Sequence, residues 1–224
     1  MNKYELILKG ISDGDTIGGP YAIASLVVKT LANDPFDLEA LDRAYRGYYL
    51  GGSFDSGPTF EKVHELLALG ETREQAVKNV HKAHRGFTAG CNPMHRFAVV
   101  AGLDIPYRTL DDLARKDAAL THFDPIAGLI SSVTVRIIRK VLENYSLTEA
   151  MRSVTNELNV AERKFLQTTP SPSGYAPAVL NAAVQFSQDP NRGLIRAIEY
   201  AGSNNYCPPI VGAFIRCIKS NLPE

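Results

Sequence analysis

The side chains best suited to binding or catalysis lie in short polar loops, each of which comes directly before an apolar segment with helical spacing. Their glycines would let backbone N–H groups approach a ligand, and the N-terminus of a helix favours anions such as phosphate. A single loop of this kind is typical of an ordinary helix cap. Because the pattern recurs, we interpret the loops as walls of one shared cleft; they are residues 13–20, 54–59, 90–96, 121–125 and 203–207.

The last of these loops contains Ser203, Asn204 and Asn205, and Pro208-Pro209 follows it. Serine and asparagine side chains hydrogen-bond to the backbone and favour turns. Prolines fit the first turn of a new helix, because an N–H group is not needed there. The residues alone allow two interpretations, a helix cap with its turn or one wall of a polar site at a helix N-terminus.

The apolar residues that must position these loops repeat with helical spacing along most of the chain, and few segments alternate with a period of two. The chain has 224 residues, of which 45% are hydrophobic, enough to bury a core as one domain. We therefore predict an all-α fold, a compact multi-helix bundle formed by a single domain over residues 1–224. Helices are predicted to begin at the capping signals Asp37, Thr72–Gln75, Thr109–Asp112 and Ser146–Glu149.

The composition argues against several classes of partner. Lys and Arg total 24 and Asp and Glu total 24, so the chain has no net charge to attract nucleic acid or an anionic membrane surface. No apolar run approaches the length of a membrane span, and Glu5 interrupts the N-terminal apolar segment, which argues against a signal peptide. Three cysteines at unrelated spacings argue against a disulfide scaffold or a zinc site. We expect a cytoplasmic protein without nucleic-acid or membrane partners.

Taken in chain order, these motifs resemble the ADP-ribosylglycohydrolase family, which includes dinitrogenase reductase-activating glycohydrolase and the J1 crystallins. Residues 14–20 are similar to its Gly-Asp-Ala-Leu-Gly-x-Pro, and residues 90–96 to its Gly-Asn-Gly-x-x-Met-Arg loop. Residues 121–127 are similar to its Thr-His-x-x-Pro-x-Ala, and residues 173–175 match its Ser-Gly-Tyr. Residues 201–213 stand where the family has Gly-Gly-Asp-Thr-Asp-Thr and then Gly-Ala.

The resemblance implies a compact helical bundle with the active site in a central cleft. It implies hydrolysis of an N- or O-glycosidic bond at the ribose of ADP-ribose, with ADP-ribose or an ADP-ribosylated substrate as the partner. A pair of divalent ions, usually magnesium or manganese, would organise the ribose hydroxyls and water. Loop 90–96 would wrap the phosphate and ribose of the substrate.

The chain departs from the family at the metal ligands. The resemblance places Ser203 and Asn205 where the family has its two C-terminal aspartates, and Asn204 and Tyr206 where it has threonines. Residues 54–57, Phe-Asp-Ser-Gly, stand where the family usually has Thr-Asp-Asp-Thr, so one of two aspartates survives there.

These departures reduce the charge available to a cation. Magnesium is usually held by one or two carboxylates, and two divalent ions about 3.5–4 Å apart repel each other unless several carboxylates neutralise them. The set Asp55, Ser56, Ser203 and Asn205 offers a single carboxylate. We therefore expect no two-metal site and no firmly bound cofactor, and at most one weakly bound magnesium with Asp55 as its candidate ligand.

The matched positions imply catalytic roles for Asp55 and His122. Asp55 would act as a general base or bind a single ion, unless it only caps the next helix, and His122 would lie in the site unless it is a structural histidine. Asp15 would reach the cleft or cap a helix, and Arg96 would face phosphate or tie loops together. The substrate contacts expected from the resemblance are Asp15, Ser56, Gly90, Cys91, Asn92, Arg96, Ser203, Asn204 and Asn205.

Two cysteines allow one further alternative for the chemistry of the site, and three other histidines are assigned to the surface. Cys91 and Cys207 each lie directly before a helix start, where the pKa of a thiol can fall, so a cysteine nucleophile competes with a small buried residue as the interpretation. Amphipathic helices carry three histidines that we predict to lie on the surface, His64, His81 and His84.

Three functions fit the sequence. The first is a divergent hydrolase in which Asp55 activates water, acting without the usual two-metal site. The second is a catalytically inactive protein that binds ADP-ribose in the same cleft after losing the metals. The third is a structural protein, as the J1 crystallins show the family can be. The order of the motifs argues for the cleft, and Ser203 and Asn205 argue against the family's usual mechanism.

Overall fold

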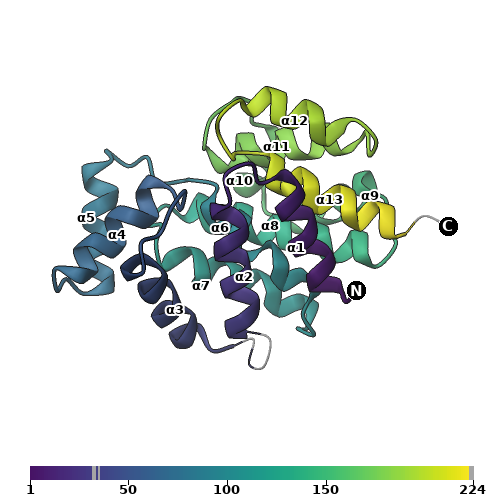
Figure 1. Ribbon diagram of the computed structural model, residues 1–224. Coiled ribbons are helices and arrows are strands. Elements are labelled where there is room, and N and C mark those ends of the chain that lie inside the picture. The colour runs from purple at the N-terminus through teal and green to yellow at the C-terminus, as the bar shows by residue number, and fades with distance from the viewer. Residues whose placement is uncertain (32–33, 35, 222–224) are drawn as a thin grey trace.

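The computed structural model describes residues 1–31, 34 and 36–221, and these residues form mostly helices (Figure 1). They contain no β-strand, only an isolated antiparallel bridge between Gly90 and Tyr175, which confirms the predicted all-α class. No helix among them is long and apolar enough to cross a membrane. The α-helices are α1 (Lys3–Gly14), α2 (Gly19–Leu31), α3 (Leu38–Leu50), α4 (Pro58–Ala68), α5 (Arg73–Ala83), α6 (Asn92–Phe97), α7 (Tyr107–Ala119), α8 (Pro125–Leu142), α9 (Leu147–Glu157), α10 (Val160–Arg163), α11 (Ala176–Ser187), α12 (Gly193–Ala201) and α13 (Pro208–Ser220). Two 3₁₀ helices, η1 (Ala98–Gly102) and η2 (Lys164–Gln167), follow α6 and α10.

Most helices begin where the local sequence signals predict. The side chains of Asp37, Thr72 and Ser146 cap α3, α5 and α9, the last two as full capping boxes. The prediction of a cap at Thr109–Asp112 is wrong, because α7 already begins at Tyr107. Pro106 leads directly into that helix, and the Thr109 hydroxyl donates to the Pro106 carbonyl (2.7 Å) within its first turn.

Helices α1 and α13 lie side by side with their backbones in close contact (Figure 1). Glycines make this approach possible, since a Cβ atom on Gly212 would overlap the carbonyl oxygen of Gly10, and one on Gly14 would overlap that of Pro208. The contact places Asp15, the residue that ends α1, beside the loop that precedes α13. Two of the predicted polar loops are therefore joined by the packing of the first helix on the last.

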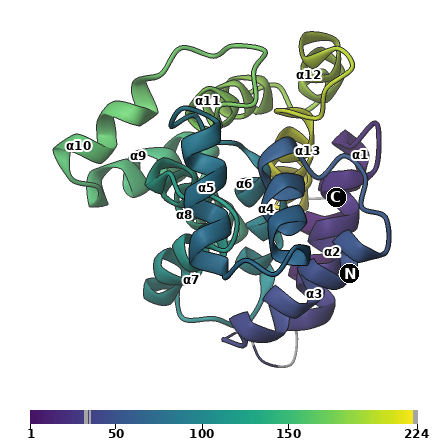
Figure 2. The same cartoon turned by 90° about the vertical axis from the view of Figure 1, so that its left-hand side faces the viewer.

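The main apolar core is one cluster of buried side chains that draws on elements from α1 to α13. Helix α8 lies within this core, and most of its residues are buried. A smaller cluster joins α4 to α5, which lie at one side of the molecule (Figures 1 and 2); it consists of Val63, Leu67, Ala76, Val77 and Val80.

Candidate functional site

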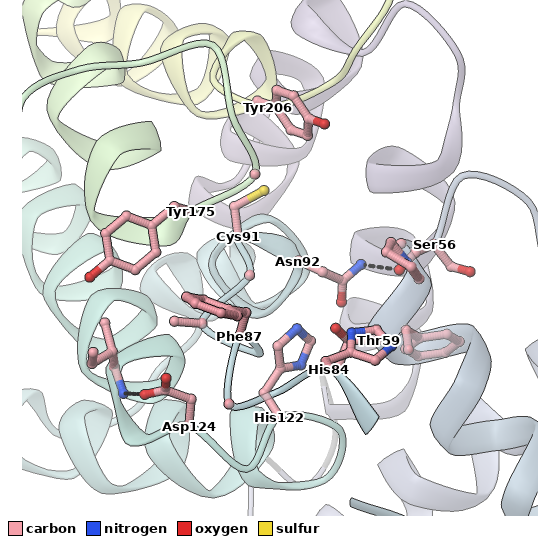
Figure 3. A pocket seen from close by; sticks show the side chains of 18 residues that line it. Ser56, Thr59, His84, Phe87, Cys91, Asn92, His122, Asp124, Tyr175 and Tyr206 are labelled. Carbon is pink, nitrogen blue, oxygen red and sulfur yellow. Dashed lines mark hydrogen bonds between the residues drawn. The ribbon is translucent and has the colours of Figure 1, made fainter. Parts of the chain in front are cut away.

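A pocket of about 630 Å³ opens where the N-terminus of α4, the start of α6, the loop before α8 and the segment before α11 meet (Figure 3). Predicted site residues from three separate loops line it, namely Ser56, Gly90, Cys91, Asn92 and His122. The remaining predicted site residues are not among its lining residues; they are Asp15, Asp55, Arg96, Ser203, Asn204 and Asn205.

Two backbone hydrogen bonds hold the loop before α6 against the segment before α11. The N–H group of Cys91 donates to the carbonyl of Gly174, and that of Ala176 donates to the carbonyl of Ala89, both at 2.9 Å. The loop at residues 90–96 therefore meets the Ser-Gly-Tyr segment at residues 173–175. This pairing joins distant segments, so helical periodicity could not reveal it.

Helix α4 begins at the wall of the pocket. Gly57 precedes it at φ 84°, a conformation suited to glycine, and none of the described side chains caps its first turn. Pro58 has no N–H group, so Thr59 and Phe60 supply the unpaired backbone N–H groups of this end. None of the residues lining the pocket in the described part of the chain is Lys or Arg. An anion bound here would therefore depend on the helix N-terminus.

Aromatic side chains form the opposite part of the wall. The side chains of Phe87 and Tyr175 are 83% and 37% exposed, and both line the pocket (Figure 3). Exposed rings of this kind are suited to stacking against a flat ring of a ligand. The sequence pattern does not single out Phe87 or give Tyr175 a role, because a lone aromatic residue in a loop carries no periodic signal.

His122 is buried yet lines the pocket, at the centre of the view in Figure 3. Its Nδ1 atom lies 2.8 Å from the hydroxyl oxygen of Thr121. Its Nε2 atom faces Gly90, where a Cβ atom would lie only 3.1 Å away. Burial, and then the positive charge of Arg96, hold the pKa of His122 well below its usual value, so the imidazole is neutral at pH 7.

Arg96 is completely buried and has partners for most of its donors. Its Nε atom donates to the Asp117 carboxylate (3.0 Å), and its Nη1 atom donates to Asn92 Oδ1 (2.7 Å) and Thr121 Oγ1 (3.0 Å). The guanidinium also lies 4.7 Å from the centre of the Tyr45 ring. Of the two roles considered for Arg96, the structure fits the one that ties loops together, and contact with phosphate does not fit a side chain with no exposed surface.

Asn205 joins two aspartates from different loops. Its side-chain nitrogen donates to Asp15 Oδ1 (2.6 Å) and to Asp55 Oδ2 (2.8 Å). Its side-chain oxygen accepts hydrogen bonds from the backbone N–H of Thr16 (3.0 Å) and from the Thr16 hydroxyl (3.1 Å). Because a backbone N–H can only donate, these partners fix the orientation of the amide. We call Asp15, Thr16, Asp55 and Asn205 the amide-bridged cluster.

Asp15 is occupied by the protein itself. Besides Asn205, its carboxylate accepts hydrogen bonds from the backbone N–H groups of Gly18 (2.6 Å) and Tyr21 (2.8 Å) at the start of α2. The structure therefore fits the helix-capping role of Asp15 and not its expected contact with substrate.

Asp55 is the more accessible carboxylate of the cluster. Its backbone has φ 47°, in the left-handed region, and its Cβ atom lies so close to α2 that a Cβ on Gly19 would be 2.6 Å away. Partial burial raises the pKa of Asp55, the hydrogen bond from Asn205 opposes the rise, and the charge of Asp15 adds to it. Ser56, the next residue, lines the pocket, so Asp55 lies close to its edge.

The donor set of the cluster does not fit the metal pair that the resemblance implies. The Asn205 amide directs N–H groups between the two carboxylates, at the place where a cation would need oxygen ligands. Among the described residues no group of three or more His, Cys, Asp or Glu side chains is arranged to hold a metal ion. We therefore assign no chemical step to a metal.

The rest of the 203–207 loop contributes little to the cluster. Ser203 and Asn204 are exposed, and their side chains form no hydrogen bond within the described chain. The polar wall expected from these residues is thus reduced to Asn205. The expected substrate contacts at Ser203 and Asn204 lie away from the pocket walls.

The cysteines do not suit nucleophilic chemistry. Burial raises the pKa of both Cys91 and Cys207 to about 12, so both thiols are protonated at pH 7. The alternative of a cysteine nucleophile therefore does not fit, although each cysteine does lie directly before a helix as the sequence predicts.

The prediction that His64 lies on the surface is wrong. Its ring packs against Phe60 with ring centres 4.1 Å apart, and its Nδ1 atom lies 2.9 Å from the Phe60 carbonyl oxygen. Burial lowers the pKa of His64 to about 4. The helical pattern suggested an exposed position because it does not show that α3 covers this face of α4 with Tyr49. His81 and His84 are partly buried.

Comparison with known proteins gives a family match for the sequence and a fold match for the structure. A sequence model of the ADP-ribosylglycohydrolase family matches residues 15–222. A solved structure described as an "ADP-ribosylglycohydrolase-related protein complex" is similar with a TM-score of 0.74 and 19% sequence identity, over 97% of this chain and 88% of that chain. At this identity the structural likeness shows the fold alone. A search of curated proteins gave no match.

Proposed function

We propose that this chain, which belongs to the ADP-ribosylglycohydrolase family, binds an ADP-ribosyl group in the pocket beside α4 without a divalent metal pair. One observation carries the proposal: the pocket is open, whereas the Asn205 amide closes the gap between Asp15 and Asp55. The ligand-binding half of the cleft is kept, and the part where the family holds its metals is bridged by a neutral side chain.

The chemistry of the pocket supports a ligand with a diphosphate and a flat base. The free N–H groups of Thr59 and Phe60 suit phosphate oxygens, and the rings of Phe87 and Tyr175 suit stacking with a base. The volume of about 630 Å³ lies within the usual range for small-molecule sites, about 300–1,000 Å³.

A second candidate function is hydrolysis of the ADP-ribosyl bond with Asp55 as the general base. The raised pKa of its carboxyl group and its position next to Ser56 at the pocket edge favour this role. Among the described residues no group donates a hydrogen bond to Asp55 Oδ1, so this oxygen is available to a water molecule. His122 would then contact the substrate from the opposite wall. The structural role known for the J1 crystallins is the outcome if no ligand binds.

Calorimetry with ADP-ribose, in EDTA and in magnesium, tests the proposal. We expect equal affinity in both conditions and a loss of roughly 5- to 150-fold for Tyr175→Ala, since base stacking contributes roughly 1–3 kcal/mol. Tyr145→Ala is the matched control, because Tyr145 is similarly exposed (45%) but lies outside the pocket. Absence of binding in both conditions would refute the proposal.

Release of ADP-ribose from ADP-ribosylated arginine or serine separates binding from hydrolysis. If the wild-type protein releases ADP-ribose, Asp55→Asn loses this activity and Asn204→Asp keeps it, the chain is a hydrolase with Asp55 as its general base, which is the second candidate function. Binding without turnover would establish the first.

The cytoplasm is the compartment that fits the cysteines best. Cys91, Cys207 and Cys217 are all free and buried, which suits a reducing environment. We propose no nucleic-acid or membrane partner, since the total charge is balanced.

A further inference from the structure

A chain of buried hydrogen bonds leads from Asp117 to the pocket. The Asp117 carboxylate accepts from Arg96 Nε (3.0 Å), Arg96 Nη1 donates to Thr121 Oγ1 (3.0 Å), and Thr121 Oγ1 lies 2.8 Å from His122 Nδ1. Asp117 and Arg96 have no exposed surface, and Thr121 is 1% exposed. We call these four residues the Arg96 network.

The direction of each hydrogen bond follows from the chemistry of the groups. A guanidinium can only donate, so Thr121 Oγ1 accepts from Arg96. The hydroxyl hydrogen of Thr121 then needs an acceptor, and His122 Nδ1 is its only partner in the described part of the chain. A buried donor without a partner costs free energy, so the hydroxyl donates to His122 Nδ1. A neutral imidazole whose Nδ1 accepts must carry its proton on Nε2.

Gly90 keeps this Nε2–H group open to the pocket. A Cβ atom at position 90 would lie 3.1 Å from His122 Nε2 and 3.6 Å from its Cδ2 atom, covering the edge of the ring that faces the cavity. Gly90 and His122 both line the pocket. The absence of a side chain at position 90 therefore gives a ligand access to the donor.

We propose that Arg96 and Thr121 are positioning residues that hold His122 as its Nε2–H tautomer, so that the pocket presents a fixed hydrogen-bond donor to an acceptor oxygen of the ligand. Identifying that oxygen as part of an ADP-ribosyl group rests on the proposed function; the tautomer does not. In this role His122 selects ligands that offer a phosphate, ether or hydroxyl oxygen beside Gly90. It has no lone pair directed into the pocket, so it does not act as a general base there.

Nuclear magnetic resonance of ¹⁵N-histidine-labelled protein tests the tautomer without any ligand. Long-range ¹H–¹⁵N correlation spectra at pH 7 distinguish the two tautomers, and His122→Asn identifies the His122 signals among the five histidines. We expect the Nε2–H form in the wild-type protein and in Thr121→Ser, which keeps the hydroxyl. Thr121→Val keeps the shape and removes the hydroxyl, so it should show a mixture of tautomers or the Nδ1–H form.

Observation of the Nδ1–H form in the wild-type protein would overturn the proposal, and this result does not depend on whether any variant folds. An unchanged tautomer in a folded Thr121→Val protein would overturn the role of Thr121.

Calorimetry with ADP-ribose then tests the ligand contact separately. We expect about tenfold weaker binding by Thr121→Val and near wild-type binding by Thr121→Ser. If the tautomer changes and the affinity does not, the donor does not contact this ligand. If the wild-type tautomer is Nε2–H and no ADP-ribose binds, the proposed function fails while the tautomer assignment stands.

Discussion

The amide-bridged cluster and the Arg96 network solve the same structural problem in opposite ways. Each joins segments that are distant in the sequence through polar side chains. In the Arg96 network a buried positive charge is balanced by Asp117 and surrounded by hydrogen-bond partners. In the cluster two carboxylates meet a neutral amide near the surface, so negative charge remains uncompensated. In the Arg96 network the charge is balanced within the protein, whereas in the cluster the Asn205 amide supplies hydrogen bonds but no positive charge.

Removal of Arg96 should have the largest effect. Arg96→Met would leave Asp117 buried without its counter-ion, and breaking a buried pair typically costs about 3–5 kcal/mol of the free energy of unfolding. Urea denaturation measures this loss. Arg43→Met is the control, because the Arg43–Glu39 pair is exposed and contributes at most about 1 kcal/mol. Equal losses of unfolding free energy in the two variants would show that the Arg96 network stabilises the fold no more than an exposed ion pair does.

The amide-bridged cluster should respond to charge instead. Asn205→Asp replaces the donated N–H groups with a third carboxylate beside Asp15 and Asp55, and we expect a loss of about 2–3 kcal/mol in EDTA. Millimolar magnesium or manganese should recover part of this loss in a thermal unfolding assay, because three carboxylates suit a divalent ion.

Asn204→Asp provides the matched control for this substitution. Asn204 is the exposed neighbour of Asn205, so a carboxylate at position 204 adds the same charge outside the cluster. Metal-dependent stabilisation of both variants, or of the wild-type protein, would contradict the assignment of Asn205 as the group that replaces the metal ligands.

The buried histidines should make the protein sensitive to acid. Burial lowers the pKa of His64 and of His95 to about 4, while the unfolded chain takes up protons near pH 6.5. The stability contributed by each neutral ring is therefore present above pH 6.5 and is lost as the pH falls towards 4. By pH 5 the loss is about 2 kcal/mol for each of the two. His122 adds a loss in the same direction.

Urea denaturation at pH 5, 6 and 7 measures this dependence. His64→Phe should flatten it, because phenylalanine keeps the packing against Phe60 and Tyr49 without titrating. The raised pKa of the exposed Asp55 acts in the opposite sense, so Asp55→Asn should steepen the acid loss slightly. A profile that stays level down to pH 5 would show that the histidines are not buried as neutral rings.

The smallest effect should come from Gly90→Ala. The added methyl group would press on the His122 ring at 3.1 Å, and we expect several-fold weaker binding of ADP-ribose with a modest change in stability. Gly47→Ala in α3 is the control, because a Cβ atom there would meet no atom of the described residues within 4 Å. This substitution should stabilise the helix by about 0.5–1 kcal/mol. If calorimetry shows the same affinity for ADP-ribose in Gly90→Ala as in the wild-type protein, His122 does not contact the ligand.

Local chemistry made much of the fold predictable. The capping boxes at Thr72 and Ser146 act within a single turn, so the sequence alone locates the starts of α5 and α9. The motif order also indicated the cleft.

The details of the site depend on contacts between distant segments. The two possible roles of Arg96 could be separated only by the position of Asp117, which lies on α7. The bridge from Asn205 to Asp15 spans 190 positions of the sequence, and no local pattern encodes it. The burial of His64 likewise comes from a neighbouring helix, α3, so the spacing within α4 cannot predict it.

The glycine contact between α1 and α13 has a consequence for the order of folding. A ribosome makes α1 long before α13, so α1 can pack on α2 and η1 early but lacks its contact with α13 until most of this sequence has emerged. Closure of so long a loop is entropically costly and is typical of slow steps in folding. During synthesis the bond between Thr16 and Asn205 can form only after residue 205 has emerged. A bulky substitution at Gly10 or Gly212 would therefore delay folding even where the finished pocket is unchanged.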